Sequence, residues 1–458
     1  MEGLEISEIK MSFLKKENRT FRIDSNFFIK KSLSVDNKIK SMNHFYISEE
    51  NIVSGPFGSS LKSDAYLNAG VPFIRIENIK NGFSISTDNL IYISEFDNSR
   101  LKSSQLFEDD LILSKVGNTI GYYARVDSNI KNCNISENNI GIKLNSYNRD
   151  VKHYIMTFLN SKYGNILTLR RISGNAQPKL NVFDISEIPI PQFNEEFYKK
   201  ISDKIIKADE LKQHSKSLYS QAEDLLLGEL GLKDWQPKNT LHTTKKFSDF
   251  AQSGRLDAEY YQPKYDEIEK VIKSYKGGYD IVSNLFNQNL DVCDYKKTEY
   301  NYVEIGDVNV GDGSVSFNKV DTSELPDNAK RVLHKNDILI SKVRPYRGAV
   351  AIIDFEQEDL IGSGAFTVLQ EKSSYKKETL QILFRTAVYK DWLLKWNVGS
   401  SYPVIKDEDI LNLPIPILPE QIQKKIASLI QQSFEYKAQS KQLLEDAKRM
   451  VEAEIEKN

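Results

Sequence analysis

The sequence predicts an α+β fold in which two mixed, mostly-β globules alternate with two long helices that pack as an antiparallel coiled coil. Three observations predict it. The chain of 458 residues contains an internal repeat, each half starts with strand-like segments, and each half ends in a charged segment with helical spacing. The length by itself favours two or three domains. We therefore expect two equivalent halves in a pseudo-twofold internal repeat.

The repeat consists of four blocks that match in the same order, with an offset that falls only from 233 to 225 residues. RIDSNFF (22–28) matches RLDAEYY (255–261), and VSGPFGSSLKSDAYLNAGVPF (53–73) matches VSNLFNQNLDVCDYKKTEYNY (282–302). DLILSKVGNTIG (110–121) matches DILISKVRPYRG (337–348), and GNAQPKLNVFDISEIPIP (174–191) matches GSSYPVIKDEDILNLPIP (399–416). Four collinear blocks indicate a duplication.

The first part of each half is predicted to be a mixed, mostly-β globule. VPFIRIENI (71–79) and NYVEIGDV (301–308) are rich in β-branched and aromatic residues, and turn residues separate such segments. These compositions are typical of strands.

A long helix is predicted after each Pro-Ile-Pro. Its apolar positions are Phe197, Ile201, Ile205, Ala208, Leu211, Leu218, Ala222 and Leu225 in the first half, and Ile422, Ile426, Ile430, Tyr436, Leu443, Ala447 and Met450 in the second. The narrow stripe favours a coiled-coil seam between the two helices. A continuous helix over 196–227 would be about 48 Å long, and this length favours a spacer. The alternative is that each helix ends its domain and extends from it as a solvated hairpin.

These elements predict four segments. The globules occupy residues 1–195 and 236–418, and the helical spacers occupy 196–235 and 419–458.

Composition restricts the location and the partners of the chain. Its net charge of -2 argues against indiscriminate coating of nucleic acid, so DNA binding would have to come from local basic loops. No apolar run is long enough to cross a membrane, no signal peptide is visible, and two cysteines cannot form a disulfide framework. We expect a cytoplasmic protein without membrane contact.

Five polar loops or strand ends are candidate nucleic-acid contacts. They comprise the loop with Gly55, Gly58, Ser59, Ser60 and Lys62; the strand ends with Lys115 and Asn118 in one half and Lys342, Arg344, Tyr346 and Arg347 in the other; and the loops with Arg170, Arg171, Asn175, Gln177 and Lys179 and with Ser400, Ser401, Tyr402 and Lys406. Arginine favours guanine edges, asparagine favours adenine edges, and backbone amides and lysines reach phosphates. Tight turns and solvated strand ends are the alternative for each.

Catalytic motifs are not visible in the sequence. No phosphate-binding GxxxxGK[ST] loop, no Gly-rich methyltransferase cofactor loop and no Asn/Asp-Pro-Pro-aromatic motif occurs, and the five histidines are scattered. Asp110, Asp337, Asp184 and Asp409 lie at matched turns or helix starts, where carboxylates cap backbone amides. We predict no catalytic residue, no metal site and no enzyme activity of the chain alone.

The motifs PFGSSLKSD (56–64) and ILPEQIQKKIASLI (417–430), the strands that end in Ser-Lys, and the Pro-Ile-Pro exits carry a family resemblance. Over nearly its whole length the chain resembles the specificity (S) subunit of type I restriction-modification systems. The resemblance implies two target-recognition domains that each read half of a bipartite, asymmetric double-stranded DNA target. It also implies helices that set the gap and dock two modification (methyltransferase) subunits, with restriction subunits in the complex.

S-adenosylmethionine, ATP and Mg are then expected on those partner subunits, with no cofactor on this chain. One departure is NLFNQNLD (284–291) where the first half has GPFGSSLK (55–62), which leaves a DNA role of the second loop open. Two other functions remain open. The chain could be a duplicated coiled-coil scaffold that binds protein partners without DNA, or a specificity module for a different methyltransferase or nuclease.

Overall fold

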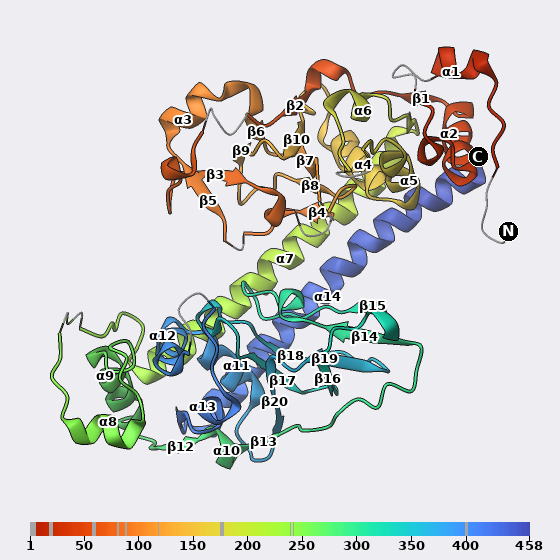
Figure 1. The fold of residues 1–458 in the computed structure, drawn as a ribbon. Coiled ribbons are helices and arrows are strands. Elements are labelled where there is room, and N and C mark those ends of the chain that lie inside the picture. Colours follow the sequence, from red (N-terminus) through yellow and green to blue (C-terminus); the bar gives the residue numbers. More distant parts are fainter. Residues whose placement is uncertain are drawn as a thin grey trace. The chain divides into compact units, whose positions relative to one another are not determined.

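The computed structural model describes residues 6–17, 22–56, 61–79, 82–87, 89–117, 119–174, 178–238, 240, 242–398 and 402–458. The chain divides into two compact units (Figure 1). Unit 1 comprises Met1–Glu210 and Gln439–Asn458, and unit 2 comprises Leu211–Ala438. Each unit therefore contains the strands of one sequence repeat together with a part of each long helix.

Three sheets are found among the described residues of unit 1. The first has the order β2 (Ile52–Ser54), β10 (Asn139–Ile142), β7 (Leu111–Ser114), β8 (Tyr123–Arg125) and β4 (Phe83–Ser84). The second has the order β5 (Ile91–Ile93), β3 (Val71–Ile74), β9 (Asn132–Ile135) and β6 (Leu106–Phe107), and the third pairs β1 (His44–Phe45) with β11 (Ile190–Pro191). All four residues of β7 are buried, which explains its continuous apolar sequence Leu-Ile-Leu.

Unit 2 repeats this strand order. Its first sheet has the order β13 (Phe286–Gln288), β20 (Phe366–Glu371), β17 (Ile338–Ser341) and β18 (Val350–Ile352). The second has the order β15 (Asn318–Asp321), β14 (Glu299–Val303), β19 (Leu360–Ser363) and β16 (Ala329–Val332), and β12 (Tyr279–Ile281) pairs with β21 (Pro414–Pro416). Both units also contain one equivalent parallel pair, β3 with β9 and β14 with β19. The internal repeat predicted from the sequence is confirmed.

Most of the shorter helices follow the same repeat, whereas α3 and α10 have no helix of the same kind at the equivalent position. Unit 1 contains α1 (Met11–Glu17), α2 (Lys30–Ser41), α3 (Glu95–Arg100), α4 (Arg149–Leu159), α5 (Lys162–Arg170) and α6 (Val182–Ser186). Unit 2 contains α8 (Phe247–Ser253), α9 (Pro263–Lys273), α10 (Val282–Leu285), α11 (Lys377–Arg385), α12 (Ala387–Trp392) and α13 (Asp407–Leu411). Polar caps start several of them; Ser161 accepts the Gly164 amide at α5, and Thr386 accepts the Tyr389 amide at α12.

Short 3-10 turns link these elements. They are η1 (Ser25–Phe28), η2 (Glu49–Asn51), η3 (Ser63–Ala65), η4 (Ile76–Asn78), η5 (Lys102–Ser104), η6 (Ile305–Asp307), η7 (Thr322–Glu324), η8 (Pro345–Arg347) and η9 (Leu393–Trp396).

The two predicted long helices are α7 (Glu195–Leu230) and α14 (Glu420–Lys457). The end of α7 is set by Gly231, whose φ is 67°. The Leu232 amide donates to the Leu227 carbonyl at 2.8 Å and the Gly231 amide donates to the Gly228 carbonyl at 3.2 Å. This pair of bonds is a Schellman motif, and glycine supplies its left-handed residue without a steric cost.

The long helices pack against each other antiparallel within each unit. In unit 1, Ile201 and Ile205 of α7 share a core with Ala447, Val451 and Ile455 of α14, and the Ser440 hydroxyl donates to the Ala208 carbonyl at 2.7 Å. In unit 2, Ala222 and Leu226 share a core with Ile426 and Ile430. There the Ser433 hydroxyl donates to the Ser215 carbonyl at 2.8 Å. The antiparallel packing predicted from the sequence is confirmed.

The buried seam differs in composition from the predicted apolar stripe. Its heptad positions are Ile201, Ala208, Ser215 and Ala222 on α7, and Ile426, Ser433, Ser440 and Ala447 on α14, all buried. Leu218 and Leu443, which the stripe includes, are only half-buried. Because alanine and serine are small, the two backbones approach closely enough for serine hydroxyls to reach carbonyls of the opposite helix.

A buried charge cluster also fixes α7 to unit 1. Arg125 of β8 forms ion pairs with Asp109, at 2.7 Å, and with Asp209 of α7. His153 of α4 contacts Asp109 at 3.3 Å and the Ser202 hydroxyl of α7 at 2.9 Å. Burial lowers the pKa of His153. Although burial opposes the charged form of Asp109, its hydrogen bonds to His153 and Arg125 hold the pKa of that carboxyl well below its usual range.

Candidate nucleic-acid interface

In each unit, the loop that leaves the central strand pairs with a hairpin from a distant part of the chain. After β7, Val116 pairs with Lys179, and Lys179 pairs with Ser173. After β17, Val343 pairs with Val404, and Val404 pairs with Val398. The structure therefore brings together the third and fourth repeat blocks, which are about 60 residues apart in sequence, by the same backbone pairing in both units.

We call these regions strand-end site 1 (residues 115–117, 173–174 and 178–180) and strand-end site 2 (residues 342–348, 398 and 402–406). Both are anchored by further backbone hydrogen bonds. The Leu180 amide donates to the Lys115 carbonyl, and the Ile405 amide donates to the Lys342 carbonyl, each at 3.0 Å. Because the pairing is fixed by backbone groups, side chains at these sites can differ between the units without changing the frame.

The first repeat block holds the base of each hairpin. The Arg22 guanidinium donates to the carbonyls of Arg171 and Ile172 at 3.1 and 2.8 Å, and the Arg255 guanidinium donates to the Asn397 carbonyl at 2.8 Å. Each arginine also forms an ion pair with the aspartate two residues later, Asp24 or Asp257. Hydrogen bonds from these arginines lower the pKa of both carboxyls. The shared Arg-x-Asp pattern therefore positions the strand-end sites.

Strand-end site 2 presents an arginine over an aromatic ring. The Arg344 guanidinium lies 4.7 Å from the centroid of the Tyr402 ring, and Tyr402 is 56% exposed. Tyr346, Arg347 and Lys406 are also exposed. Within the part of the chain that the structure describes, no carboxylate forms an ion pair with Arg344, Arg347 or Lys406. These cations are available to phosphates or base edges.

Among the described residues, Lys342 has its charge paired within the unit, unlike Arg344, Arg347 and Lys406. Its ammonium group forms a 3.1 Å ion pair with Asp407, whose carboxylate also accepts the Thr367 hydroxyl at 2.6 Å. Since this charge is neutralised within the unit, Lys342 stabilises the site and offers less positive charge to a ligand than Lys406 does.

Strand-end site 1 carries lysines instead of arginines. Lys179 is exposed and Lys115 is half-buried, and no carboxylate among the described residues pairs with either. Lys62, in the Gly-Pro-Phe-Gly loop region, is exposed as well. The remaining predicted contacts, Gly58, Ser59, Ser60, Asn118, Gln177 and Ser401, and the neighbouring Asn175 and Ser400, lie outside the described residues.

Two predicted contacts, Arg170 and Arg171, lie in the interior of unit 1. Arg170 forms a 2.8 Å ion pair with Asp36, and the two side chains are 2% and 1% exposed. Arg171 donates to the Glu187 carbonyl at 2.8 Å and is 5% exposed. A buried guanidinium has to be paired, and both arginines have their partners inside the protein. This placement does not favour direct DNA contact by either arginine.

The four matched aspartates act as caps. Asp184 accepts the Asn181 amide at 2.9 Å, and Asp409 accepts the Lys406 amide at 2.7 Å. Asp110 accepts the Phe107 amide at 2.9 Å, and Asp337 accepts the His334 amide at 2.9 Å. The capping role predicted from the sequence is confirmed.

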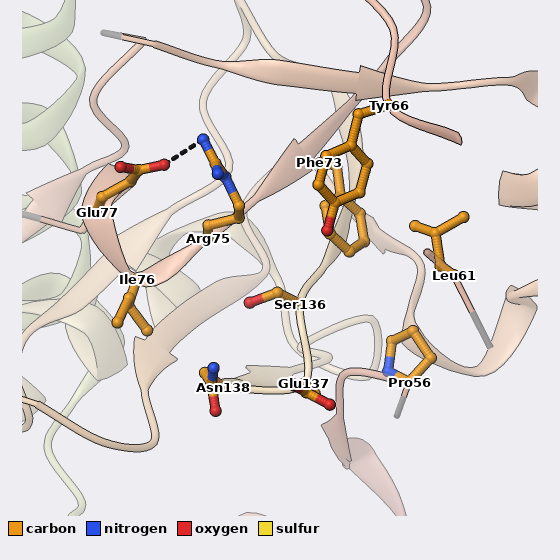
Figure 2. A pocket seen from close by; sticks show the side chains of 10 residues that line it. All are labelled: Pro56, Leu61, Tyr66, Phe73, Arg75, Ile76, Glu77, Ser136, Glu137 and Asn138. Carbon is orange, nitrogen blue, oxygen red and sulfur yellow. Dashed lines mark ion pairs between the residues drawn. The ribbon is translucent and has the colours of Figure 1, made fainter. Parts of the chain in front are cut away.

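A hollow beside strand-end site 1 is the site feature that the sequence reading missed (Figure 2). Its volume is about 400 Å³, and it is lined by Pro56, Leu61, Tyr66, Phe73, Arg75, Ile76, Glu77, Ser136, Glu137 and Asn138. Arg75 and Glu77 form an ion pair on one wall, and Tyr66 and Phe73 form an aromatic wall. These residues come from the Gly-Pro-Phe-Gly loop region, from a strand-like segment and from a turn that is far from both in the sequence, so nothing in the sequence indicates that they share a hollow.

Backbone contacts join this hollow to the neighbouring loops. The Lys115 amide donates to the Asn138 carbonyl at 2.8 Å. Gly55 lies against the same turn, because a Cβ atom there would come within 1.9 Å of the Ser136 carbonyl oxygen. Glycine is thus required at the start of the Gly-Pro-Phe-Gly motif for close backbone approach.

Among the described residues, no group of three or more histidine, cysteine, aspartate and glutamate side chains could hold a metal ion. Both cysteines, Cys133 and Cys293, are free and buried. No helix within the described ranges is both long and apolar enough to span a membrane.

Comparison with protein families identifies the class of domain. Residues 279–448 match the family described as type I restriction modification DNA specificity domain. The matched residues include strand-end site 2 and most of α14. The predicted resemblance to the specificity subunit of type I restriction-modification systems is thereby confirmed.

Solved structures with similar chains include two S subunits. One is the S subunit of a type I restriction-modification system from M. genitalium, with 13% identity and a TM-score of 0.41 over 90% of this chain and 95% of that chain. The other is the HsdS subunit from Thermoanaerobacter tengcongensis, with 13% identity and a TM-score of 0.26 over 92% of this chain and 95% of that chain. A comparison with curated proteins finds no match.

Proposed function

We propose that the chain is the non-catalytic specificity subunit of a type I restriction-modification complex and reads a bipartite, asymmetric target in double-stranded DNA. Strand-end site 1 contacts one half-site, and strand-end site 2 contacts the other. The observation that carries the proposal is that the two sites share their backbone pairing but differ in their side chains. The same backbone arrangement with different side chains suits two different DNA half-sites that are bound in the same orientation.

The charges of the two sites support DNA as the ligand. Site 1 presents Lys179 and the half-buried Lys115, Lys62 is exposed in the Gly-Pro-Phe-Gly loop region, and site 2 presents Arg344, Arg347 and Lys406. The net charge of -2 gives the chain little general attraction to phosphates, so these local cations supply the binding. Lysines at site 1 favour phosphate contacts, and arginines at site 2 favour bidentate contacts to guanine.

The two long helices serve in this proposal as the spacer between the half-sites. Each contributes residues to both units, with α7 divided at Glu210 and α14 at Ala438. The close seam of serine and alanine positions supports a stiff pair. Their length then sets the number of base pairs between the half-sites.

The proposed partners are two modification subunits and restriction subunits. Because the specificity subunit presents its features twice, two copies of the modification subunit can bind equivalently, each over one half-site. S-adenosylmethionine on the modification subunits supplies the methyl group for an adenine in each half-site, and ATP and Mg bind to the restriction subunits. This chain aligns the modification subunits with the target sequence and binds no cofactor.

Single-molecule methylation mapping tests the proposal in cells. DNA from cells that carry this chain and its neighbouring modification subunit is compared with DNA from cells that lack this chain. The expected result is a two-part N6-methyladenine motif that disappears without the chain. An unchanged methylome would contradict the proposal and favour a scaffold that binds only proteins.

Binding by the purified complex tests the two sites separately. Lys179→Ala and Lys406→Ala should each weaken binding to the mapped duplex and reduce the slope of log affinity against log salt by about 1. Lys335→Ala is the matched control, because Lys335 is an exposed lysine ahead of β17, at the opposite end of that strand from site 2. A control that weakens binding as much as Lys406→Ala would refute the assignment of site 2.

A further inference from the structure

Residue 344 occupies a position where the backbone is left-handed. Arg344 has φ 49° and ψ 53°, and its equivalent in the first repeat, Gly117, has φ 88°. Both are 1 residue beyond the paired valines Val116 and Val343, so the equivalence follows from the backbone pairing. A Cβ atom at Gly117 would meet nothing within 4 Å. The conformation, and not a lack of space, is therefore what favours glycine at this position.

An arginine at this position costs conformational free energy that a glycine does not. Such a strained non-glycine residue points to a function when its side chain makes no contact that the fold requires. In the part of the chain that the structure describes, no carboxylate pairs with the Arg344 guanidinium, and no hydrogen bond from it is found. The fold would tolerate glycine here, as it does in the first repeat.

The surroundings of Arg344 hold its side chain in place. Its amide donates to the Pro403 carbonyl at 2.8 Å, and its carbonyl accepts the Arg347 amide at 3.0 Å. The guanidinium lies over the exposed Tyr402 ring. An aromatic face restrains a guanidinium while leaving its N–H groups available, so less entropy is lost when they bind a ligand.

We infer that Arg344, positioned by Tyr402, reads one guanine of the second half-site by donating two hydrogen bonds to its N7 and O6 atoms in the major groove. This inference rests on the proposed function and adds the single arginine that reads the base, the groove, and the positioning role of Tyr402. The first repeat has Gly117 at this position and therefore makes no equivalent contact. The left-handed position is thus one source of the asymmetry between the two half-sites.

The test uses the complex of this chain with its modification subunit and the duplex identified by methylation mapping. Each guanine is replaced in turn by 7-deazaguanine, which lacks the N7 acceptor, or by inosine, which keeps N7 and O6 and lacks the minor-groove amino group. Deaza substitution at one position of one half-site should weaken binding about 5- to 150-fold, whereas inosine there should have little effect. No sensitive guanine in either half-site would overturn the inference.

Variants of residue 344 test the same contact from the side of the protein. Arg344→Gly should lose the preference for guanine at that position, and 7-deazaguanine should then cause no further loss. Arg344→Lys keeps the charge but not the paired donors, and should lose most of the preference. Tyr402→Leu should weaken the preference, and Tyr402→Phe should keep it. Lys335→Ala should leave it unchanged.

The outcomes separate this inference from the proposed function. If Arg344→Gly keeps the guanine preference, residue 344 does not read the base, although the complex still binds its bipartite target. If the unmodified complex binds no specific duplex, the proposed function itself fails. Arg344→Gly should not lower the thermal unfolding temperature, because glycine relieves the left-handed strain, and a folded variant therefore keeps the test informative.

Discussion

Replacing Arg170 by alanine should destabilise unit 1 without removing a DNA contact. In the structure Arg170 and Asp36 form a 2.8 Å ion pair with almost no exposure, and Arg170 also donates to the Phe27 carbonyl at 2.9 Å. The variant leaves the Asp36 carboxylate buried. Breaking a buried pair by removing one partner costs about 3–5 kcal/mol.

The lower end of that range applies because Lys40 remains 3.0 Å from Asp36. A loss of about 3 kcal/mol corresponds to a fall of about 6–12 °C in the unfolding temperature of a domain of 150–250 residues. Calorimetry of the purified chain measures this change. Lys179→Ala is the matched control, because its side chain is exposed and its loss should leave the unfolding temperature within about 2 °C.

Binding to the target duplex should rank the two variants in the opposite order from their unfolding temperatures. Lys179→Ala should weaken binding, whereas Arg170→Ala, measured well below its unfolding temperature, should bind almost normally. An Arg170→Ala chain that keeps its unfolding temperature but loses DNA affinity would refute the interior role of Arg170 and restore it as a contact.

Three further predictions concern pH, spacing and specificity. The folded-state pKa of His153 lies below its usual value, so the folded state favours the neutral ring. The contribution of His153 to stability is therefore full above pH about 6.5, and it falls with decreasing pH by at most about 1.4 kcal/mol per pH unit. The depressed pKa of Asp109 adds a further loss of stability below pH about 4. Urea unfolding from pH 8 to pH 5 should show the first slope, and His153→Gln should flatten it; an equal slope in the variant would contradict this. The spacer is tested by adding seven residues after Lys212 in α7 and seven after Glu435 in α14, which lengthens both helices by about 10 Å. Methylation mapping should then show that the preferred gap between the half-sites is wider by about 3 base pairs, with both half-sites intact. An unchanged gap would refute the spacer role. Arg347→Ala should relax the sequence preference of one half-site only, and equal relaxation of both would rule out its assignment to site 2.

The sequence was sufficient for the architecture because duplication and hydrophobic spacing are local signals. The strands ending in Ser-Lys-Val are β7 and β17, and the Pro-Ile-Pro segments lead into the two long helices. The seam was predicted less well. Ser215, Ser433 and Ser440 are polar, so a search for apolar spacing passes over them, although small size is what that interface requires.

The candidate site could be predicted only in part, because sequence shows residue type but not direction. Arg170 and Arg171 precede a polar loop, as a DNA contact would, yet Arg170 pairs inside the unit with Asp36, more than 100 residues away in sequence, and Arg171 bonds to Glu187. Lys342 likewise pairs with Asp407. The left-handed backbone at Arg344 and the hollow with Arg75 depend on tertiary contacts for which the sequence carries no local signal.

The composition of unit 1 has a consequence for synthesis on the ribosome. Unit 2 is continuous from Leu211 to Ala438, whereas unit 1 needs Gln439–Asn458 to complete it. Ala447, Val451 and Ile455 are fully buried in its core, so a chain released before Ala447 exposes the apolar faces of Ile201 and Ile205. Translation thus delivers the residues of the second unit before those that close the first. Prematurely terminated chains carry an open core that proteases and chaperones recognise.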